Sequence, residues 1–115
     1  MIITFKTEVL GNQPGLQDDY KNIERVIDAR EKPVLTLDFK MIEYATSATL
    51  SWMVQIGNKI RKKDGEFKII NVQAPLFKTF RFVNLDRVAT IEVLPEEEII
   101  VEIEEPAEGE NASKS

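Results

Sequence analysis

The sequence predicts an α/β fold in which helices pack against a mixed β-sheet. The first observation is an alternation of short segments rich in β-branched residues with segments of helical periodicity, in the order β, α, β, α, β, α, β. The second observation is size, because 115 residues, 43% of them hydrophobic, suit one compact domain with a single core. Strands and helices that alternate in this way form a sheet covered by helices.

The first strand is expected over Ile2–Leu10, where apolar residues alternate along the chain, and the segment Gly11–Gly15 ends it. A helix of about fourteen residues begins at Leu16. Spacings of four, three and four place its apolar residues on one helix face: Leu16, Tyr20, Ile23 and Ile27. Pro33 ends this segment, and Val34–Leu37 predict a short, buried central strand.

A second amphipathic helix follows the loop of residues 39–45. Its apolar face consists of Leu50, Met53, Val54, Gly57 and Ile60. The turn of residues 64–65 ends it, and Glu66–Val72 predict another strand. Pro75 opens a third helix. The apolar face of this helix consists of Leu76, Phe77, Phe80 and Val83. Thr90–Leu94 predict a further short strand.

Negative charge is concentrated in the C-terminal segment. Residues 96–115 contain eight acids and one lysine, a net charge of −7, which leaves fourteen bases and twelve acids, or +2, in residues 1–95. Residues 104–115 combine Glu, Pro, Gly and Ser without a large apolar side chain, so we expect a disordered acidic tail after a domain of residues 1–103. Residues 96–103 fit either a helix or an edge strand.

The composition excludes most familiar enzyme mechanisms. The chain has no cysteine and no histidine, which excludes disulfides, thiolate zinc sites, cysteine nucleophiles and histidine bases. Asp38 and Glu43 are the only carboxylates near the start of the second helix, and two acids without a third group make no plausible catalytic or metal site. We therefore expect a protein that is not an enzyme and that uses no metal or cofactor.

The sequence also predicts a cytoplasmic protein without membrane insertion. Charges at Lys6 and Glu8 interrupt any signal segment, and the longest uncharged run, residues 44–58, falls short of the roughly 20 apolar residues that span a bilayer. Four basic residues gather at the end of the second helix: Lys59, Arg61, Lys62 and Lys63. They suit the negative end of the helix dipole, and because no aromatic residue interleaves with them we expect no nucleic acid binding.

The stretch Leu37–Leu50, LDFKMIEYATSATL, resembles the signature of the STAS domain, the fold of anti-sigma factor antagonists. The strand end, Leu37 and Asp38, matches the family pattern. Where the family continues with aspartate, serine, serine or threonine, glycine and leucine, this chain has, in order, Thr46, Ser47, Ala48, Thr49 and Leu50. Residues 64–72 and 80–88 are similar to two further family segments, so the resemblance extends over residues 34–94.

The resemblance implies a protein-binding function with an altered switch. In the antagonists the second hydroxyl residue of the pattern is phosphorylated by an anti-sigma factor that is itself a serine kinase, and here that position is Ala48. Two alternatives remain: phosphorylation of the neighbouring Ser47 or Thr49, or constitutive binding. The loss of the motif carboxylate at Thr46 favours constitutive binding.

The same residues also have a purely structural interpretation. Thr46 or Ser47 can cap the second helix, because a side-chain oxygen there accepts a hydrogen bond from a free backbone N–H group. Trp52 and Ile56 lie off the main apolar face of that helix. They either widen its contact with the core or, in the case of Trp52, present an exposed aromatic anchor to a partner.

The leading hypothesis is a non-enzymatic regulatory module that binds an anti-sigma factor or a related regulatory protein. We expect its partner-binding residues to be Thr46, Ser47, Ala48, Thr49, Leu50 and Trp52. The alternative is a structural or scaffold STAS subunit of a larger complex or of a homo-oligomer. Binding of a small ligand at the helix start is a third hypothesis, which rests on the fold alone.

Overall fold

The computed structural model of the chain describes residues 1–95, and they form a four-stranded sheet in the order β1-β3-β5-β6. These strands are β1 (Ile2–Thr4), β3 (Val34–Asp38), β5 (Glu66–Val72) and β6 (Thr90–Val93). The predicted α/β class is confirmed. The described strands pair in parallel throughout, whereas the sequence led us to expect a mixed sheet. The reason is that a crossover containing a helix separates each strand from its next neighbour in the sheet.

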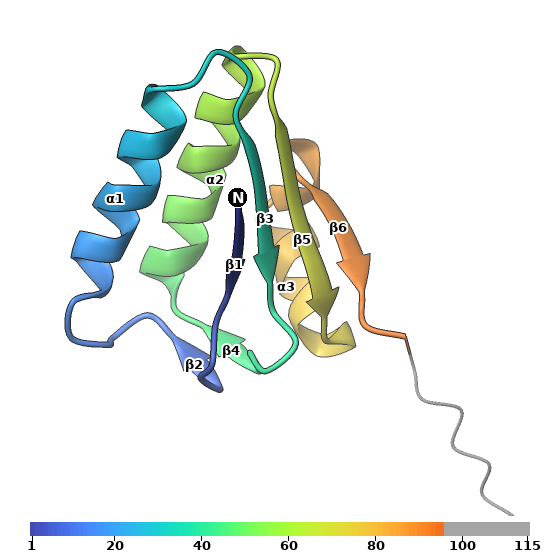
Figure 1. Cartoon of the computed structure of the whole chain (residues 1–115). Coiled ribbons are helices and arrows are strands. Elements are labelled where there is room, and N and C mark those ends of the chain that lie inside the picture. Colours follow the sequence, from blue (N-terminus) through green and yellow to red (C-terminus); the bar gives the residue numbers. More distant parts are fainter. Residues whose placement is uncertain (96–115) are drawn as a thin grey trace, which may run out of the picture.

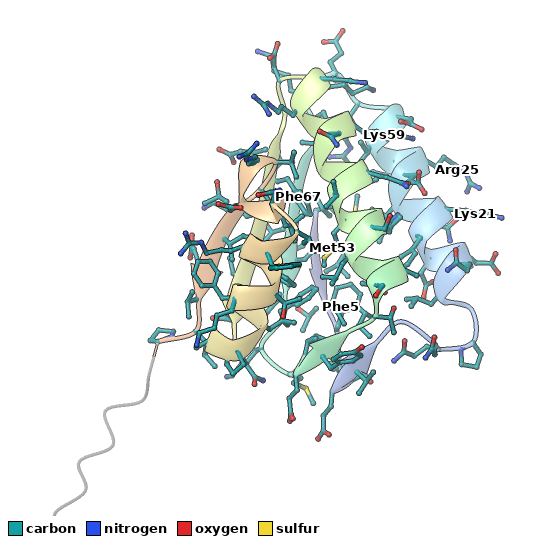
Figure 2. The ribbon with its side chains drawn as sticks, turned by 180° about the vertical axis from the view of Figure 1, so that it is seen from behind. Phe5, Lys21, Arg25, Met53, Lys59 and Phe67 are labelled. Carbon is teal, nitrogen blue, oxygen red and sulfur yellow. The ribbon has the colours of Figure 1, made fainter. Side chains whose placement is uncertain are left out.

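Three helices cover one face of the sheet (Figure 1). They are α1 (Leu16–Asp28), α2 (Ser47–Lys62) and α3 (Ala74–Phe82), and a short 3-10 turn, Leu85–Arg87, follows α3. The strands lie in the sheet in the order of the chain, so each crossover moves in the same direction. Because such crossovers are right-handed, they place all three helices on the same side. The view from behind has the helices in front of the strands (Figure 2).

The apolar faces of the first two helices are largely as the sequence predicts. In α1 the four buried residues are Leu16, Tyr20, Ile23 and Ile27, which confirms the predicted face. In α2 the predicted Leu50, Met53, Gly57 and Ile60 are buried, and Val54 is half-buried. Trp52 and Ile56 are buried as well, so the buried stripe of α2 is wider than its main periodicity indicates.

The predicted first strand, Ile2–Leu10, is in fact two short strands. β1 pairs with β3, whereas β2 (Val9–Leu10) pairs with β4 (Tyr44–Ala45) in a separate two-stranded sheet. The apolar alternation slips between Phe5 and Val9, and the chain leaves the main sheet there. As a result, β2 lies beside the segment that leads into α2.

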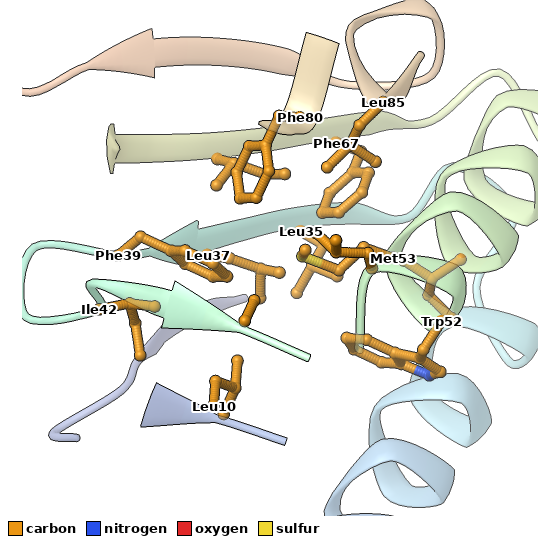
Figure 3. Packing of buried hydrophobic residues seen from close by; sticks show 14 of the residues in the cluster. Leu10, Leu35, Leu37, Phe39, Ile42, Trp52, Met53, Phe67, Phe80 and Leu85 are labelled. Atoms are coloured by element: carbon orange, nitrogen blue, oxygen red, sulfur yellow. The ribbon is translucent and has the colours of Figure 1, made fainter. Parts of the chain in front are cut away.

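The core extends into the loop between β3 and β4 (Figure 3). Phe39 and Ile42 belong to this loop and are fully buried, although the sequence offers no periodicity there. The ring of Phe39 makes edge-to-face contacts with Phe5 and Phe80, with ring centroids 5.6 and 5.7 Å apart. These contacts hold the loop that precedes α2 against the end of the sheet.

The face of the sheet opposite the helices is not covered by any element within residues 1–95. Its side chains are Ile2, Thr4, Val34, Thr36, Asp38, Glu66, Lys68, Ile70, Thr90 and Glu92. We call this set the open sheet face. Residues 96–103, for which helix and strand were both predicted, the domain boundary at residue 103 and the acidic tail all lie outside the described residues.

Candidate functional site

The start of α2 is fixed by hydrogen bonds of Thr46, which is the N-cap residue. The Thr49 backbone N–H donates to the Thr46 hydroxyl oxygen over 3.3 Å, and the Thr46 backbone N–H donates to the Leu10 carbonyl over 3.0 Å. Capping is therefore confirmed for Thr46, whereas Ser47 is the first residue of the helix itself. The bond to Leu10 ties the helix start to β2.

Close packing of Gly11 against Thr46 reinforces this junction. A β-carbon at position 11 would collide with the side chain of Thr46. Glycine at this position therefore allows β2 to lie close to the N-cap. Any larger residue would require the Thr46 side chain to move.

Thr49 points into the interior rather than toward a partner. Its side chain is 1% exposed, and its hydroxyl oxygen lies 2.7 Å from the Tyr20 hydroxyl and 3.3 Å from the Thr46 hydroxyl. Burial raises the pKa of Tyr20, and the bond with Thr49 opposes that rise only in part, so the phenol is neutral. The expectation that Thr49 is a phosphorylation or docking residue conflicts with this burial, since a kinase must reach the hydroxyl.

Trp52 is part of the core and not an exposed anchor. Only 7% of its surface is exposed, and its indole stacks on the Tyr20 ring with centroids 3.9 Å apart and planes inclined by 8°. The interpretation of Trp52 as an exposed aromatic anchor is therefore wrong. Its side chain joins α2 to α1. The indole N–H has no hydrogen-bond acceptor among the described residues.

The accessible side chains in the first part of α2 are uncharged, and most of them are small. Ser47, Ala48, Ser51 and Gln55 are exposed, and we call them the α2 stripe. Leu50, predicted to contact a partner, is mostly buried beneath the stripe but reaches the wall of a hollow beside it.

A hollow lies on each side of the α2 stripe. The hollow toward α3 has a volume of about 190 Å³ and is lined by Ser47, Leu50, Ser51, Val54 and Val83. The hollow toward α1 has a volume of about 350 Å³. Polar side chains from both helices contribute to its walls, among them Gln17, Lys21, Glu24 and Gln55. The stripe is therefore a ridge between two depressions, one mainly apolar and one lined by both polar and apolar groups.

Comparison with protein families identifies the domain. The STAS domain profile matches residues 18–98, which is well over half of the chain. The chain belongs to the STAS domain family. No curated protein sequence matches it. STAS domains are generally non-enzymatic modules that mediate protein-protein interactions.

Asp38, at the strand end of the STAS signature, has a structural role. Its carboxylate accepts the Lys40 backbone N–H over 3.0 Å and the Asn71 side-chain amide over 3.1 Å. Asn71 has a positive φ of 57°, at an irregularity in the pairing of β5 with β6. Asp38 therefore holds the start of the loop and the distorted part of β5 together.

The basic residues near the end of α2 mostly hold α1 in place. Lys59 lies 3.4 Å from the carboxylates of Glu24 and Asp28, and Figure 2 shows it between the two helices. The Lys63 ammonium donates to three carbonyl oxygens at the end of α1, those of Ile27, Asp28 and Arg30. The sequence predicted that these bases stabilise the end of their own helix, whereas Lys59 and Lys63 contact the end of α1.

Two further observations concern residues 1–95 alone. Within this range no three acidic side chains come close enough to hold a metal ion. No helix in the described part of this STAS domain combines the length and the apolar character needed to cross a bilayer.

Proposed function

We propose that this STAS domain is a regulatory binding module that acts in the manner of an anti-sigma factor antagonist. Its partner is an anti-sigma factor, a serine kinase of that type or a similar regulator, and the docking surface is the α2 stripe with its two hollows. The observation that supports the proposal best is the ridge of small, uncharged side chains at the family's signature position.

The shape of this surface suits a protein partner. Small residues on the ridge let a partner backbone approach closely, and each hollow can receive a side chain of the partner. Leu50 and Val54 supply apolar contact area in the hollow toward α3, whereas Lys21 and Gln55 supply polar groups in the hollow toward α1. Apolar pockets surrounded by polar groups are the usual sites of strong interface contacts.

The proposed regulation follows from which hydroxyls are accessible. Ala48 has no hydroxyl, and Thr49 is enclosed by Tyr20 and Thr46. Ser47 is exposed at the first position of α2. A phosphate on Ser47 would add close to two negative charges on the ridge. It would repel an acidic partner surface, and binding would have to remove the water around the phosphate at a cost in free energy. We favour constitutive binding, with Ser47 as the single accessible alternative within the signature.

Phosphorylation is tested by incubating the full chain with the native cell extract and ATP, followed by mass spectrometry. Constitutive binding predicts no added phosphate on any signature residue. Phosphate on Ser47, with loss of partner binding, would replace constitutive binding by a switch. Phosphate on Thr49 in the folded protein would contradict the burial described above.

The docking surface is tested by co-purification with identification of the recovered proteins. Ala48→Arg places a long charged side chain on the ridge, and Asn58→Arg places the same side chain on the exposed side of α2 further along the helix. We expect an anti-sigma type regulator to be recovered with the wild type and Asn58→Arg but not with Ala48→Arg. Recovery of the same proteins by all three variants would count against this surface.

A structural subunit is the second candidate, and the open sheet face favours it. Parallel sheets are usually covered on both faces, and Ile2 is 73% exposed on this one, near the exposed Val34. A second copy of the chain could cover it. Light scattering over a range of concentrations tests this candidate. Self-association that Ile2→Lys abolishes and Ala48→Arg leaves unchanged would support a scaffold role. A monomer at all concentrations would exclude self-association through this face.

A further inference from the structure

The hollow between α2 and α3 lies beside the end of α3, which carries an exposed aromatic side chain. Val83 forms one wall of the hollow, and the preceding residue, Phe82, is 88% exposed, more than any other large apolar residue in the described part of the chain. Leu50 and Val54 form the opposite wall. An apolar hollow next to an exposed phenylalanine is an unpartnered apolar patch of the kind that marks an interaction site.

The segments on the two sides of the hollow carry net positive charge or none. α3 contains Lys78 and Arg81 and no acid, and residues 47–55 of α2 carry no charged side chain. Asp86 and Arg87, in the turn after α3, offset each other. The N-terminus of α2 adds the positive end of a helix dipole. An occupant of the hollow should therefore combine apolar side chains with negative charge.

Residues 96–115 of this chain have that composition. They contain eight glutamates and one lysine, and their large apolar residues are clustered at Ile99, Ile100, Val101 and Ile103. The segment follows Pro95 directly, and the Leu94 N–H donates to the Val72 carbonyl, which fixes its starting point near the end of β5.

The distances allow this segment to reach the hollow. α3 begins at Ala74, two residues after β5 ends, and its nine residues rise by about 13 Å toward Phe82. Eight residues, from 96 to 103, can span up to roughly 26–29 Å. The apolar cluster therefore has enough chain to pass along α3 to the hollow.

We propose that the hollow and Phe82 bind the chain's own segment of residues 96–110. The side chains of residues 99–103 contact Leu50, Val54, Val83 and Phe82, and the glutamates lie near Lys78, Arg81 and the start of α2. The open sheet face is a poorer site, because Asp38, Glu66 and Glu92 outnumber Lys68 there and Lys68 is already paired with Glu92 at 3.8 Å. An acidic segment would be repelled from it.

This contact would regulate the docking surface, a consequence that rests on the proposed function. The segment would cover Ser47 and Ser51, so a regulator would have to displace it before binding the α2 stripe. A covering segment could therefore limit partner binding in a chain whose usual phosphorylation position is Ala48.

The test uses the full chain without any partner, so its failure would be distinct from failure of the docking proposal. Because the protein has no cysteine, Ala107→Cys provides a single attachment site for a nitroxide spin label. We expect the label to remove most of the amide NMR signal intensity of Ser47, Ser51 and Val83 at low salt. The intensity should return at about 1 M salt, where the Debye length is about 3 Å.

Two substitutions provide the matched comparison. Phe82→Ser should restore the intensities, and Ile2→Ser, at another exposed apolar side chain on the open sheet face, should leave the broadening unchanged. Three results would each overturn the proposal. The first is broadening confined to Thr36 and Ile70, and the second is the same signal intensity at every amide, without local broadening. The third is broadening at the hollow that persists in Phe82→Ser. A mixing experiment tests whether the contact is within one molecule. Spin-labelled chains without isotope enrichment are mixed with isotope-enriched chains that carry no spin label. Broadening in this mixture would also overturn the proposal, since the contact would then be between molecules.

Discussion

The phenol ring of Tyr20 lies flat on the indole of Trp52, with ring centroids 3.9 Å apart. This stack joins α1 to α2 directly behind the signature segment, and the Tyr20 hydroxyl also contacts the Thr49 hydroxyl at 2.7 Å. The side chains that face inward at the start of α2 are therefore committed to holding two helices together. Only the opposite side of the helix is free to meet a partner.

Replacing Trp52 should affect stability rather than recognition. We expect Trp52→Ala to lower the free energy of unfolding by about 3–5 kcal/mol, because the change removes a large buried ring and leaves a cavity. Chemical denaturation followed by circular dichroism measures this loss. An Ala variant as stable as the wild type would mean that Trp52 is at the surface, contrary to its burial.

Tyr20 should make stability fall at alkaline pH. Its pKa is raised in the folded protein from an ordinary value of 10.0, so the folded state holds its proton more tightly than the unfolded state. The stabilisation that comes from this difference in pKa is therefore fully present below pH 10, and it is lost as the pH rises from there through the folded-state pKa. We expect Tyr20→Phe to lessen the alkaline loss and to cost about 1 kcal/mol at neutral pH for the hydrogen bond to Thr49. Urea denaturation from pH 8 to pH 11.5 tests both parts, and identical pH profiles for the two proteins would refute the first.

The N-cap role of Thr46 predicts a difference between two adjacent hydroxyl residues. Thr46→Ala should destabilise the protein by about 0.5–2 kcal/mol, since the Thr49 N–H would lose its acceptor. Ser47→Ala, the matched control, should change stability by less than about 0.5 kcal/mol because Ser47 is exposed. Thermal unfolding of the two variants measures their stability. A larger loss of stability in Ser47→Ala than in Thr46→Ala would mean that Ser47, and not Thr46, caps the helix.

Gly57 should resist replacement although it lies within a helix. A β-carbon at this position would press on the side chains of Val88 and Phe67. We expect overpacking in Gly57→Ala to lower the free energy of unfolding by about 1–3 kcal/mol. This loss should outweigh the gain of about 1 kcal/mol that alanine brings through its higher helix propensity. Asn58→Ala, at the next and exposed position, should be neutral or slightly stabilising. A more stable Gly57→Ala protein would show that the contact with the turn after α3 is loose.

The sequence predicts the local elements well where side-chain periodicity is decisive. The face of α1 and the spans of β3, β5 and β6 agree with their hydrophobic patterns to within a residue. The burial of Phe39 and Ile42 was not predictable in this way, because it depends on contacts with residues far along the chain, such as Phe5 and Phe80. The division of the first strand likewise depends on the distant partner β4.

The start of α2 and its cap were predicted from the sequence, whereas the burial of the side chains around them was not. The signature located the start of α2, and the capping pattern identified Thr46. Periodicity alone could not tell whether Trp52 faced the core or a partner, since both fit a wide apolar stripe. The exposed Phe82 and the wall formed by Val83 were missed, because the sequence places them at the end of an amphipathic helix without any sign that a hollow lies beside it.

The central claim is that a regulatory protein docks on the α2 stripe, and titration calorimetry with the purified regulator tests it most directly. The account predicts that Ala48→Arg weakens binding by at least about thirtyfold, equivalent to about 2 kcal/mol, while Asn58→Arg binds as the wild type does. Binding by Ala48→Arg as tight as that of the wild type would contradict the account.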